Sequence, residues 1–466
     1  MTSTSELFFT LNGERVSLPG ISPSMTLLHY LQQSRRTGTK EGCGDGDCGA
    51  CTVAIATRNS EGKPCYQAVN SCLIPLGAIA GREIVTVEGI ADGRLHPVQA
   101  AMVESGGSQC GYCTPGFIMS LFSAYYDGKV DDFSVEGNLC RCTGYIPIRH
   151  AARQVTNAQP VDRFSERLAQ VDLDLSEVAY STQAQQFYRP TQLSEALELL
   201  QRYPNATLVA GGTDLGLEMS HHRRSFPVLI SLEGVAQLQQ IEQTSERLVI
   251  GAAVPLQTIE TTLKGIFPGL DEMLHWFAAR QVRNRATIGG NLGTASPIGD
   301  LPPVLLALDA ELKIANSTQT RTILLADFFK GYRQTDLGND EIIVSISIPK
   351  SIRGAKRLSQ AYKVGKRGTD DISIVAAAFV VDLDDDRAIV QARLGYGGVA
   401  ATPIRAIEVE NLLVGRPWTI ETIQMVKPIL RETFTPLTDL RGSADYRKLL
   451  VANLFEKFFV EMEEQS

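Results

Sequence analysis

The twelve residues from Lys40 to Cys51, KEGCGDGDCGAC, contain three cysteines and four glycines and decide how the N-terminal part of the chain folds. Glycine adopts positive φ angles and leaves room for backbone N–H groups, so this composition suits a loop that wraps an inorganic core. A zinc ribbon would pair two short C-x2-C knuckles, and a C-x4-C arm fits that arrangement poorly. The spacing Cys43-x4-Cys48-x2-Cys51 instead favours a [2Fe-2S] cluster, in which the loop supplies thiolates to both irons.

Two later cysteines, Cys65 and Cys72, could supply the fourth thiolate. The runs CTVAIAT (51–57) and CYQAVNS (65–71) flank the turn RNSEGKP and predict a β-hairpin. In this hairpin Cys72 returns beside the loop, while Cys65 lies opposite Thr57, about 20 Å away at ~3.3 Å per residue. Cys65 is therefore predicted to be an ordinary, partly buried thiol. The predicted ligands of this cluster are Cys43, Cys48, Cys51 and Cys72.

Chain length, net charge and cysteine distribution limit the class of protein. A chain of 466 residues is too long for one hydrophobic core and predicts several domains. Its 44 basic and 52 acidic residues give a net charge of -8, which argues against nucleic acid or an anionic membrane as a partner. The start MTSTSELFFT has no signal-peptide pattern and no run is apolar enough to cross a membrane, so we predict a cytoplasmic protein. Eight of the nine cysteines lie in two tight groups, which favours metal ligation over disulfides.

The second cysteine group has two similar halves, QCGYCTPGF and NLCRCTGYIPI, each with two cysteines, a threonine and a helix-like pattern. Thr114 and Thr143 are predicted helix N-caps, with Pro115 in the first helical position. Two helix N-termini carry partial positive charge and would suit an anionic cluster. The predicted ligands of a second [2Fe-2S] cluster are Cys110, Cys113, Cys140 and Cys142.

Spacing alone leaves a structural zinc site open for this second group. The nearby first cluster favours iron, because electron hopping needs centres in series. A thioredoxin-like dithiol at Cys110 and Cys113 lacks the βαβ pattern that normally precedes it.

Two glycine turns follow a polar, glycine-free segment (157–186) that we interpret as a linker. An amphipathic helix pattern, a strand over Thr207–Ala210 and the turn Gly211-Gly212-Thr213-Asp214 come first; Gly289-Gly290-Asn291 forms the second turn. Such turns can hold one pyrophosphate from both sides through backbone N–H groups and small hydroxyls. Glycine pairs also mark plain turns. This pattern alone therefore leaves both a nucleotide site and ordinary turns open.

Several of these motifs resemble one known family. KEGCGDGDCGACTV, SQCGYCTPGF and NLCRCTGY resemble the iron-sulfur half of the xanthine dehydrogenase family of molybdenum hydroxylases, and LVAGGTDLG and ATIGGNLGTASPIGD resemble its FAD-binding segments. The resemblance covers nearly the whole chain except the linker and the last few residues. Asp47 departs from it, since many relatives carry glycine there, and we expect this to alter the potential of the first cluster.

The resemblance implies an α+β multidomain fold. Its predicted parts are a β-grasp, plant-type ferredoxin-like [2Fe-2S] domain (1–90), a helical-bundle [2Fe-2S] domain (91–156), the linker (157–186), a vanillyl-alcohol-oxidase-type FAD domain (187–350) and a C-terminal α+β flavin-associated domain (351–466).

The same resemblance implies roles for single residues. The residues implied to line the FAD diphosphate and ribityl chain are Leu208, Val209, Ala210, Gly211, Gly212, Thr213, Asp214, Leu215, Thr287, Ile288, Gly289, Gly290 and Asn291. Phe277 and Ile343 would pack on the ring system, or else be ordinary core residues, and Asp300 and Lys363 would make polar contacts. Gln109 would touch a molybdopterin on a partner chain. Tyr332, Arg333 and Asp370 would flank an NAD+ site, or else be surface side chains.

The C-terminal part is predicted to contain strands in RLSQAYKVG, DISIVAAAFVVDL and AIVQARLGYGGV and a final helix. The apolar face of that helix, predicted to be core or subunit contact, is Leu449, Leu450, Leu454 and Phe458. Gly395-x-Gly397-x-x-Ala400 is the nearest match to a Rossmann fingerprint, but Pro403 interrupts any helix and no acidic residue follows as that fold requires. We interpret it as a turn and expect NAD+ to bind against the flavin.

The sequence contains no Ser-His-Asp set, no HExxH and no molybdopterin-binding region, so we expect no catalytic residue on this chain. The leading hypothesis is the small subunit of a two-chain, bacterial-type xanthine dehydrogenase. It would pass electrons from a molybdenum centre on a large partner subunit through two [2Fe-2S] clusters to FAD and NAD+ during hypoxanthine and xanthine hydroxylation, within a dimer of heterodimers. The alternatives are a self-contained NADH-dependent iron-sulfur flavoprotein reductase, a subunit of another molybdenum hydroxylase acting on a different heterocycle or aldehyde, and a zinc-stabilised nucleotide-binding scaffold.

Overall fold

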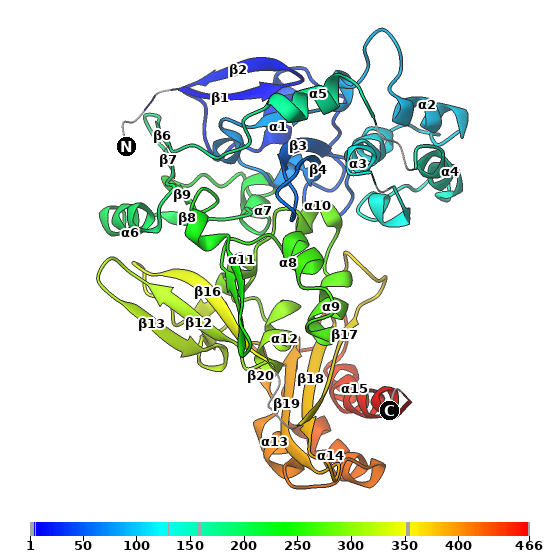
Figure 1. The fold of residues 1–466 in the computed structure, drawn as a ribbon, viewed down its shortest axis with the longest axis vertical. Helices are drawn as coiled ribbons and strands as arrows, with labels where there is room; N and C mark the ends of the chain where they lie inside the picture. Colours follow the sequence, from blue (N-terminus) through cyan, green and yellow to red (C-terminus); the bar gives the residue numbers. More distant parts are fainter. Residues whose placement is uncertain (1–3, 5, 129, 157–159, 351–354, 465–466) are drawn as a thin grey trace. The chain divides into compact units, whose positions relative to one another are not determined.

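The computed structural model describes residues 4, 6–128, 130–156, 160–350 and 355–464. They form two compact units (Figure 1). Unit 1 contains residues 1–236, 255–258 and 278–286, and unit 2 contains residues 237–254, 259–277 and 287–466. The predicted FAD domain (187–350) contributes to both units, and the short elements η5 (Ala236–Leu238) and α8 (Leu256–Thr262) lie where the chain passes between them.

Unit 1 begins with a five-stranded sheet of order β2-β1-β5-β3-β4, in which only β1 and β5 are parallel. The elements of this part are β1 (Glu6–Leu11), β2 (Glu14–Pro19), α1 (Leu27–Gln33), β3 (Thr52–Arg58), β4 (Pro64–Asn70), η1 (Ser71–Leu73), η2 (Leu76–Ile79), β5 (Glu83–Val85) and η3 (Val87–Gly89). Strand β1 alternates exposed and buried side chains, as a strand with one face on the core does. Its buried residues Leu7 and Phe9 pack with Leu27 and Leu31 of α1, which gives the predicted β-grasp arrangement.

A helical part follows in unit 1, built from α2 (Pro97–Glu104), α3 (Thr114–Tyr126), η4 (Asp132–Val135) and α4 (Ile146–Gln154). Helix α3 is buried from Gly116 to Tyr125 and forms the centre of this bundle. An aromatic cluster closes its far end, where Phe122 and Tyr126 pack edge-on against the ring of Phe164. These helices carry the second cysteine group at their N-terminal ends.

The segment predicted as a linker, 157–186, contains secondary structure that the prediction lacked; residues 157–159 lie outside the described residues. Helix α5 (Arg163–Gln170) buries Phe164 and Leu168 in the core of the helical part, and β6 (Val178–Ser181) pairs with β7. The apolar residues of α5 are too few to stand out in the sequence, and their burial depends on α3, a partner distant in the chain.

The third part of unit 1 is a four-stranded sheet of order β6-β7-β9-β8. Its elements are β7 (Gln186–Arg189), α6 (Leu193–Arg202), β8 (Thr207–Val209), α7 (Leu215–Ser220) and β9 (Val228–Ser231), and α10 (Arg280–Arg283) also belongs to unit 1. Its core is continuous with that of the first sheet, since a Cβ at Gly77 would lie 2.4 Å from the ring of Phe187. The strand predicted at Thr207–Ala210 is confirmed as β8.

Unit 2 contains an antiparallel sheet of order β10-β11-β16-β12-β13 and a small ribbon, β14-β15. The elements here are β10 (Ile241–Gln243), β11 (Arg247–Gly251), α9 (Pro268–His275), α11 (Ile288–Gly293), α12 (Leu301–Ala307), β12 (Glu311–Ala315), β13 (Thr320–Leu324), η6 (Leu325–Asp327), β14 (Phe329–Gly331), β15 (Gln334–Thr335) and β16 (Ile342–Pro349). Every pair in the five-stranded sheet is antiparallel.

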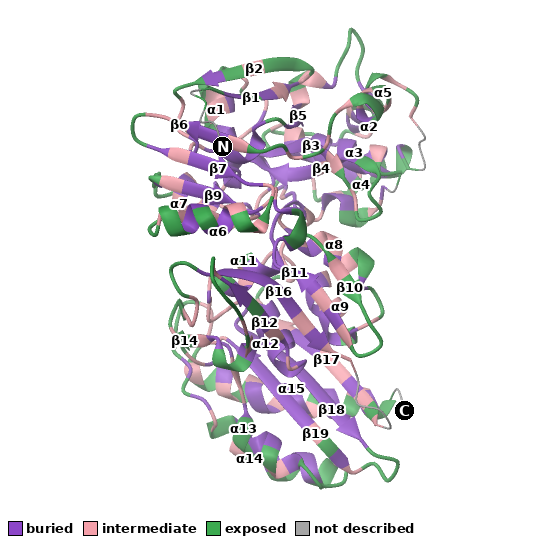
Figure 2. Cartoon of the chain, turned by 60° about the vertical axis from the view of Figure 1, so that its left-hand side comes forward, coloured by how far each residue is buried: buried purple, intermediate pink, exposed green. Residues whose placement is uncertain are grey.

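The C-terminal part of unit 2 is a sheet of order β17-β18-β19-β20 covered by helices. Its elements are β17 (Lys356–Val364), β18 (Val375–Leu383), β19 (Ile389–Gly397), β20 (Ile404–Arg405), α13 (Ile407–Leu413), α14 (Ile420–Glu432) and α15 (Ala444–Glu464). All residues of β18 are buried (Figure 2), because α15 covers one face and α12 the other. The three strands predicted in this part are confirmed, and so is the α+β multidomain fold.

One prediction in this part needed correction. Gly395 and Gly397 belong to strand β19 rather than to a turn, and glycine at position 395 lets α12 approach the strand, because a Cβ there would lie 2.2 Å from the Pro303 carbonyl oxygen. On the α15 face predicted to be core or subunit contact, Leu454 and Phe458 are buried in the core, Leu450 is partly buried and Leu449 is 40% exposed.

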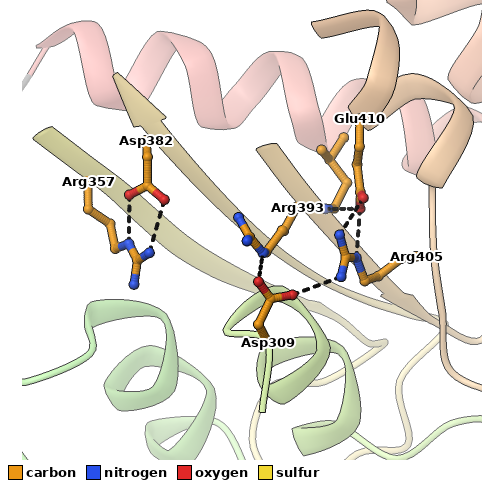
Figure 3. Close-up of polar contacts among 7 residues, drawn as sticks. Asp309, Arg357, Asp382, Arg393, Arg405 and Glu410 are labelled. Atoms are coloured by element: carbon orange, nitrogen blue, oxygen red, sulfur yellow. Dashed lines mark hydrogen bonds and ion pairs between the residues drawn. The ribbon is translucent and has the colours of Figure 1, made fainter. Parts of the chain in front are cut away.

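Buried charges join α12 to the C-terminal sheet (Figure 3). Asp309, just after α12, accepts hydrogen bonds from Arg393 of β19 and from Arg405 of β20, the latter at 2.8 Å. Arg405 also pairs with Glu410 of α13, whose carboxylate accepts the N–H of Leu394 at 2.8 Å. A buried charge is costly without a partner, so these contacts fix the position of α12 on the sheet.

Candidate iron-sulfur and flavin sites

The first cysteine loop is curled as its glycines predict. Gly44, Gly46 and Gly49 all have positive φ, and a Cβ at Gly42 would lie 2.5 Å from Cys48 Sγ. The N–H of Cys43 donates to Cys48 Sγ and the N–H of Cys48 donates to Cys43 Sγ, both at 3.3 Å. The hydrogen bond from Cys43 lowers the pKa of the Cys48 thiol to about 6, which favours a thiolate. The loop therefore presents these two sulfurs as a pair.

The β3–β4 hairpin has the register that the sequence predicted. Thr52 pairs with Asn70 and Thr57 with Cys65, and Cys72 Sγ lies 3.3 Å from Cys51 Sγ. Two thiolates on one tetrahedral metal at about 2.3 Å lie a little under 4 Å apart, so Cys51 and Cys72 fit a common iron. Burial raises the pKa of Cys65 to about 12, so that thiol is neutral, and it is fully buried rather than partly buried as predicted.

The second cysteine group also forms pairs. Hydrogen bonds join Cys113 to Cys140 and Cys110 to Cys142. Burial and the bond to Cys140 raise the pKa of Cys113 to about 12. Cys110 and Cys142 are exposed, while Cys140 is buried. The predicted set of four thiols thus lies together at the N-terminal ends of α3 and α4.

Both predicted helix N-caps in this group are wrong. Cys113 is the N-cap of α3, so Thr114 is its first residue, and Tyr145 is the N-cap of α4. Tyr145 has a left-handed φ of 68°, and its hydroxyl accepts the N–H of Cys140 at 3.0 Å. The Thr143 hydroxyl is instead hydrogen-bonded to Cys140 Sγ at 3.2 Å and accepts the N–H of Tyr145.

The pairwise grouping of the thiols fits binuclear clusters. Each iron of a [2Fe-2S] cluster takes two cysteine thiolates, whereas a structural zinc ion draws four ligands to one point. Both cysteine groups therefore fit a [2Fe-2S] cluster better than zinc.

Asn70 is one residue near the first loop that the sequence did not single out. Its amide Nδ2 donates to the Gly46 carbonyl oxygen at 2.7 Å, and its Oδ1 lies 3.8 Å from Cys51 Sγ. Only the hairpin register brings Asn70 to the loop. Its position directly before Ser71 and Cys72 was the only available signal.

The first predicted FAD segment, Leu208–Leu215, lies in unit 1 between β8 and α7. A Cβ at Gly211 would lie 1.8 Å from the Arg285 carbonyl oxygen, and Gly212 has a φ of +78°, so both positions require glycine. Gly216, at the start of α7, packs against the backbone of Leu73, since its Cβ would lie 2.4 Å from the Leu73 oxygen. The segment is thus fixed directly beside the residue that follows Cys72.

The second predicted FAD segment, Thr287–Asn291, lies in unit 2. The turn predicted at Gly289-Gly290-Asn291 is wrong, because these residues belong to helix α11 (Ile288–Gly293). Thr287 caps α11 by accepting the N–H of Gly290 at 3.1 Å, and a Cβ at Gly289 would lie 2.7 Å from the Ala252 oxygen. Asn291 Oδ1 is buried and has no hydrogen-bond partner in the described chain. A buried amide oxygen normally has a hydrogen-bond partner. The Oδ1 of Asn291 therefore fits a ligand that has donor groups, such as FAD.

The predicted polar and ring-contacting residues also lie in unit 2. Lys363 Nζ pairs with Asp300 Oδ2 at 2.9 Å and donates to the Trp276 carbonyl oxygen at 3.0 Å, and Ser373 Oγ donates to Asp300 Oδ1 at 2.5 Å. Ile343 of β16 is buried and Phe277 is half-buried. Lys363 and Asp300 are thus brought together as a buried ion pair beside the residue that precedes Phe277.

Of the remaining predicted residues, Tyr332, Arg333 and Gln109 are exposed and Asp370 is half-buried. Tyr332 is 64% exposed in the turn between β14 and β15, next to Arg333, and Asp370 lies in the turn between β17 and β18. Arg333 and Asp370 have left-handed φ angles of 51° and 62°. Gln109 is exposed in unit 1, directly before Cys110.

Among the described residues, no helix is both long and apolar enough to span a bilayer.

Family models match almost the whole chain. A 2Fe-2S iron-sulfur cluster binding domain matches residues 9–76, a [2Fe-2S] binding domain 86–153, an FAD binding domain in molybdopterin dehydrogenase 181–351, and a CO dehydrogenase flavoprotein C-terminal domain 360–462. The chain is therefore an iron-sulfur flavoprotein with two [2Fe-2S]-binding domains and one FAD-binding domain.

Known proteins narrow this class. The chain is 33% identical to xanthine dehydrogenase 2 of Arabidopsis thaliana, over 98% of this chain and 40% of that protein. It is 32% identical to xanthine dehydrogenase/oxidase of Gallus gallus over the same shares. The chain thus spans about two fifths of the length of these relatives. It belongs to the molybdenum hydroxylase family and has the domains of that family's iron-sulfur and FAD part.

Two solved structures illustrate the similarity of fold. Carbon monoxide dehydrogenase from Hydrogenophaga pseudoflava has a TM-score of 0.55 at 28% identity, covering 58% of this chain and 94% of that chain. Quinoline 2-oxidoreductase from Pseudomonas putida 86 has a TM-score of 0.54 at 28% identity, covering 62% of this chain and 98% of that chain.

Proposed function

We propose that this chain is the electron-transfer subunit of an NAD+-dependent xanthine dehydrogenase. It receives electrons from a molybdenum centre on a large molybdopterin-binding partner subunit while hypoxanthine and xanthine are hydroxylated, and delivers them to NAD+. The observation that carries this proposal is the match to xanthine dehydrogenases over 98% of the chain, across all four of its domains. The similarity to the solved carbon monoxide dehydrogenase and quinoline 2-oxidoreductase covers less of this chain, 58% and 62% respectively.

The thiols that we assign to the first cluster are Cys43, Cys48, Cys51 and Cys72, and those that we assign to the second are Cys110, Cys113, Cys140 and Cys142. When bound, [2Fe-2S] clusters exchange single electrons, and FAD accepts electrons singly and releases them as hydride. The first cysteine loop donates backbone N–H groups to sulfur, which stabilises an anionic group.

We assign the two glycine segments and their neighbours to FAD. Residues 208–215 and 287–291 are these segments, and Asn291 supplies a buried acceptor without a hydrogen-bond partner in the described chain. Lys363, fixed by Asp300, places a positive charge beside Phe277. We place the nicotinamide near Tyr332, Arg333 and Asp370, and we assign Gln109, which precedes the exposed Cys110, to the molybdopterin contact.

We further propose a cytoplasmic dimer of heterodimers. Eight cysteines that form two metal-binding groups rather than disulfides suit a reducing compartment.

The test is anaerobic purification with native partners, followed by metal, flavin and EPR analysis. We expect a larger molybdenum-containing chain to co-purify, about four iron atoms and one FAD per copy of this chain, and two distinct EPR signals. Hypoxanthine should bleach the visible absorbance, and NAD+ should restore it. Zinc in place of iron, or full activity as a lone NADH reductase, would refute the proposal.

A second candidate is a molybdenum hydroxylase for another substrate, because quinoline 2-oxidoreductase is among the solved structures of similar fold. The same preparation decides between them. Bleaching by quinoline or by an aldehyde, with none by hypoxanthine, would assign the chain to that second function.

A further inference from the structure

The two cysteine groups meet through one backbone hydrogen bond in unit 1. The N–H of Leu139 donates to the carbonyl oxygen of Cys48 at 2.9 Å. Leu139 is covalently joined to Cys140, and Cys48 belongs to the first cysteine loop. One hydrogen bond thus connects a predicted ligand of the first cluster to the residue before a predicted ligand of the second.

The backbones on either side of this bond touch directly. A Cβ at Gly116 of α3 would lie 2.2 Å from the Gly49 carbonyl oxygen, and a Cβ at Gly49 would lie 2.1 Å from the Gly137 carbonyl oxygen. Side chains at these positions would force the two loops apart. The glycines therefore allow the close approach, but they supply no directional contact that would hold the loops in register.

Asn138, the residue before Leu139, supplies that directional contact and is only 2% exposed. Its Nδ2 donates to the Gly49 carbonyl oxygen at 3.0 Å and to Thr52 Oγ1 at 3.3 Å. Its Oδ1 accepts from Ser120 Oγ at 2.6 Å and from Gln281 Nε2 at 3.2 Å. The amide uses both its donors and its acceptor.

The partners of Asn138 come from three separate segments. Gly49 and Thr52 belong to the first cysteine loop and β3, Ser120 to α3, and Gln281 to α10. A buried amide is costly unless it is fully bonded, and a fully bonded one fixes the relative position of the segments that bond to it. Moving either loop would leave polar atoms unsatisfied at this point.

We propose that Asn138 is a positioning residue for electron transfer between the two clusters. It holds the Leu139 N–H against the Cys48 carbonyl oxygen and so fixes this hydrogen-bonded route between the two sets of thiols. This inference rests on the proposed function, because it takes Cys48 and Cys140 as cluster ligands. Gln281 ties the same point to the segment that returns from the flavin-binding part of the chain.

Helix α3 offers a matched pair of variants for the test. Ser120→Ala removes the 2.6 Å bond to Asn138 and a 3.1 Å bond from Gln281 Nε2, while Ser123→Ala removes a bond at 3.2 Å to the Met119 carbonyl oxygen within the same helix. Both serines are buried, at 2% and 6% exposure, so the two substitutions differ mainly in whether they touch the contacts of Asn138 and its partner Gln281. Asn138→Ala removes all of these contacts and gives the larger perturbation.

Three measurements on the holoprotein are needed. Iron content and the two EPR signals report whether both clusters are present. Hydrogen–deuterium exchange of the peptide that contains Leu139 reports the link itself, and the spin–spin splitting between the two reduced clusters at low temperature reports their coupling.

We expect Ser120→Ala to keep both clusters and to speed exchange of the Leu139 amide by about tenfold, because a buried bond that supports it is lost. In Asn138→Ala the Leu139 amide should exchange faster still, and the spin–spin splitting between the two reduced clusters should be narrower. Ser123→Ala should match the wild type in both.

Wild-type exchange and splitting in Ser120→Ala and Asn138→Ala, with both clusters present, would overturn the inference. If Asn138→Ala fails to assemble its clusters, the comparison of Ser120→Ala with Ser123→Ala tests the inference by itself. A wild-type protein without two iron clusters refutes the proposed function instead, and the iron assay separates that outcome from the others.

Discussion

Single alanine substitutions at Cys72 and Cys65 test which thiol completes the first cluster. Cys72 Sγ lies 3.3 Å from Cys51 Sγ at the base of the hairpin. Cys65 pairs with Thr57, whereas the base of the ladder is the pair Thr52–Asn70. At ~3.3 Å per residue, Cys65 therefore lies about 17 Å along the strand from the loop, far beyond the length of an iron–sulfur bond.

The two substitutions differ in the expected iron content. Losing one of four thiolates leaves an iron with an open position, so Cys72→Ala should lower the iron content from about four to about two atoms per chain. Cys65→Ala removes a neutral, buried sulfur and should cost about 1 kcal/mol of stability without loss of iron.

The assay is iron and acid-labile sulfide per chain after anaerobic purification, with EPR of the dithionite-reduced protein. Cys72→Ala should show one [2Fe-2S] signal, assigned to the second cysteine group, and Cys65→Ala should show both. Loss of iron in Cys65→Ala together with full iron in Cys72→Ala would show that the hairpin register does not select the ligand.

Three further substitutions test the flavin segment, the aromatic cluster and the charge network. Gly211→Ala places a Cβ 1.8 Å from the Arg285 oxygen, so the backbone must shift and FAD content, measured by absorbance per protein, should fall by about half or more. Burial lowers the pKa of His96 from 6.5 to about 4, so its neutral form stabilises the fold above pH 6.5 and this contribution, roughly 3 kcal/mol, is lost as the pH falls to 4. His96→Gln should flatten that loss in denaturation curves measured between these pH values. Asp309→Ala leaves two largely buried arginines without their shared partner; since Asp309 is 28% exposed, we expect a loss of about 2 kcal/mol, seen as a Tm lower by at least about 4 °C.

Each of these expectations has a contrary result. Full FAD content in Gly211→Ala would show that the segment can move freely. An unchanged pH profile in His96→Gln would mean that His96 does not titrate in this range. Asp385→Ala, at an exposed hairpin position, is the control for Asp309→Ala, and equal Tm values for the two would remove the network from the account.

Interactions between residues close in the chain were predictable. The hairpin register followed from the two β-rich runs that flank the turn RNSEGKP, and this register selected Cys72 over Cys65. The helix starts were predicted less well, because Cys113 and Tyr145 took the N-cap positions expected for Thr114 and Thr143. A sulfur-rich turn competes for the threonine hydroxyl, as Thr143 shows by bonding Cys140 Sγ.

The sequence by itself determined the two cysteine groups, the glycine turn at 211–214 and the strands of the C-terminal sheet, because these depend on spacing and periodicity within short stretches. Tertiary structure alone decided what packs around them. Asn138 meets Gly49 and Gln281 across large separations in the chain, and Asp309 meets Arg393 and Arg405 in the same way. Local spacing fixes local geometry, whereas the pairing of buried polar groups depends on which distant segments the whole fold brings together.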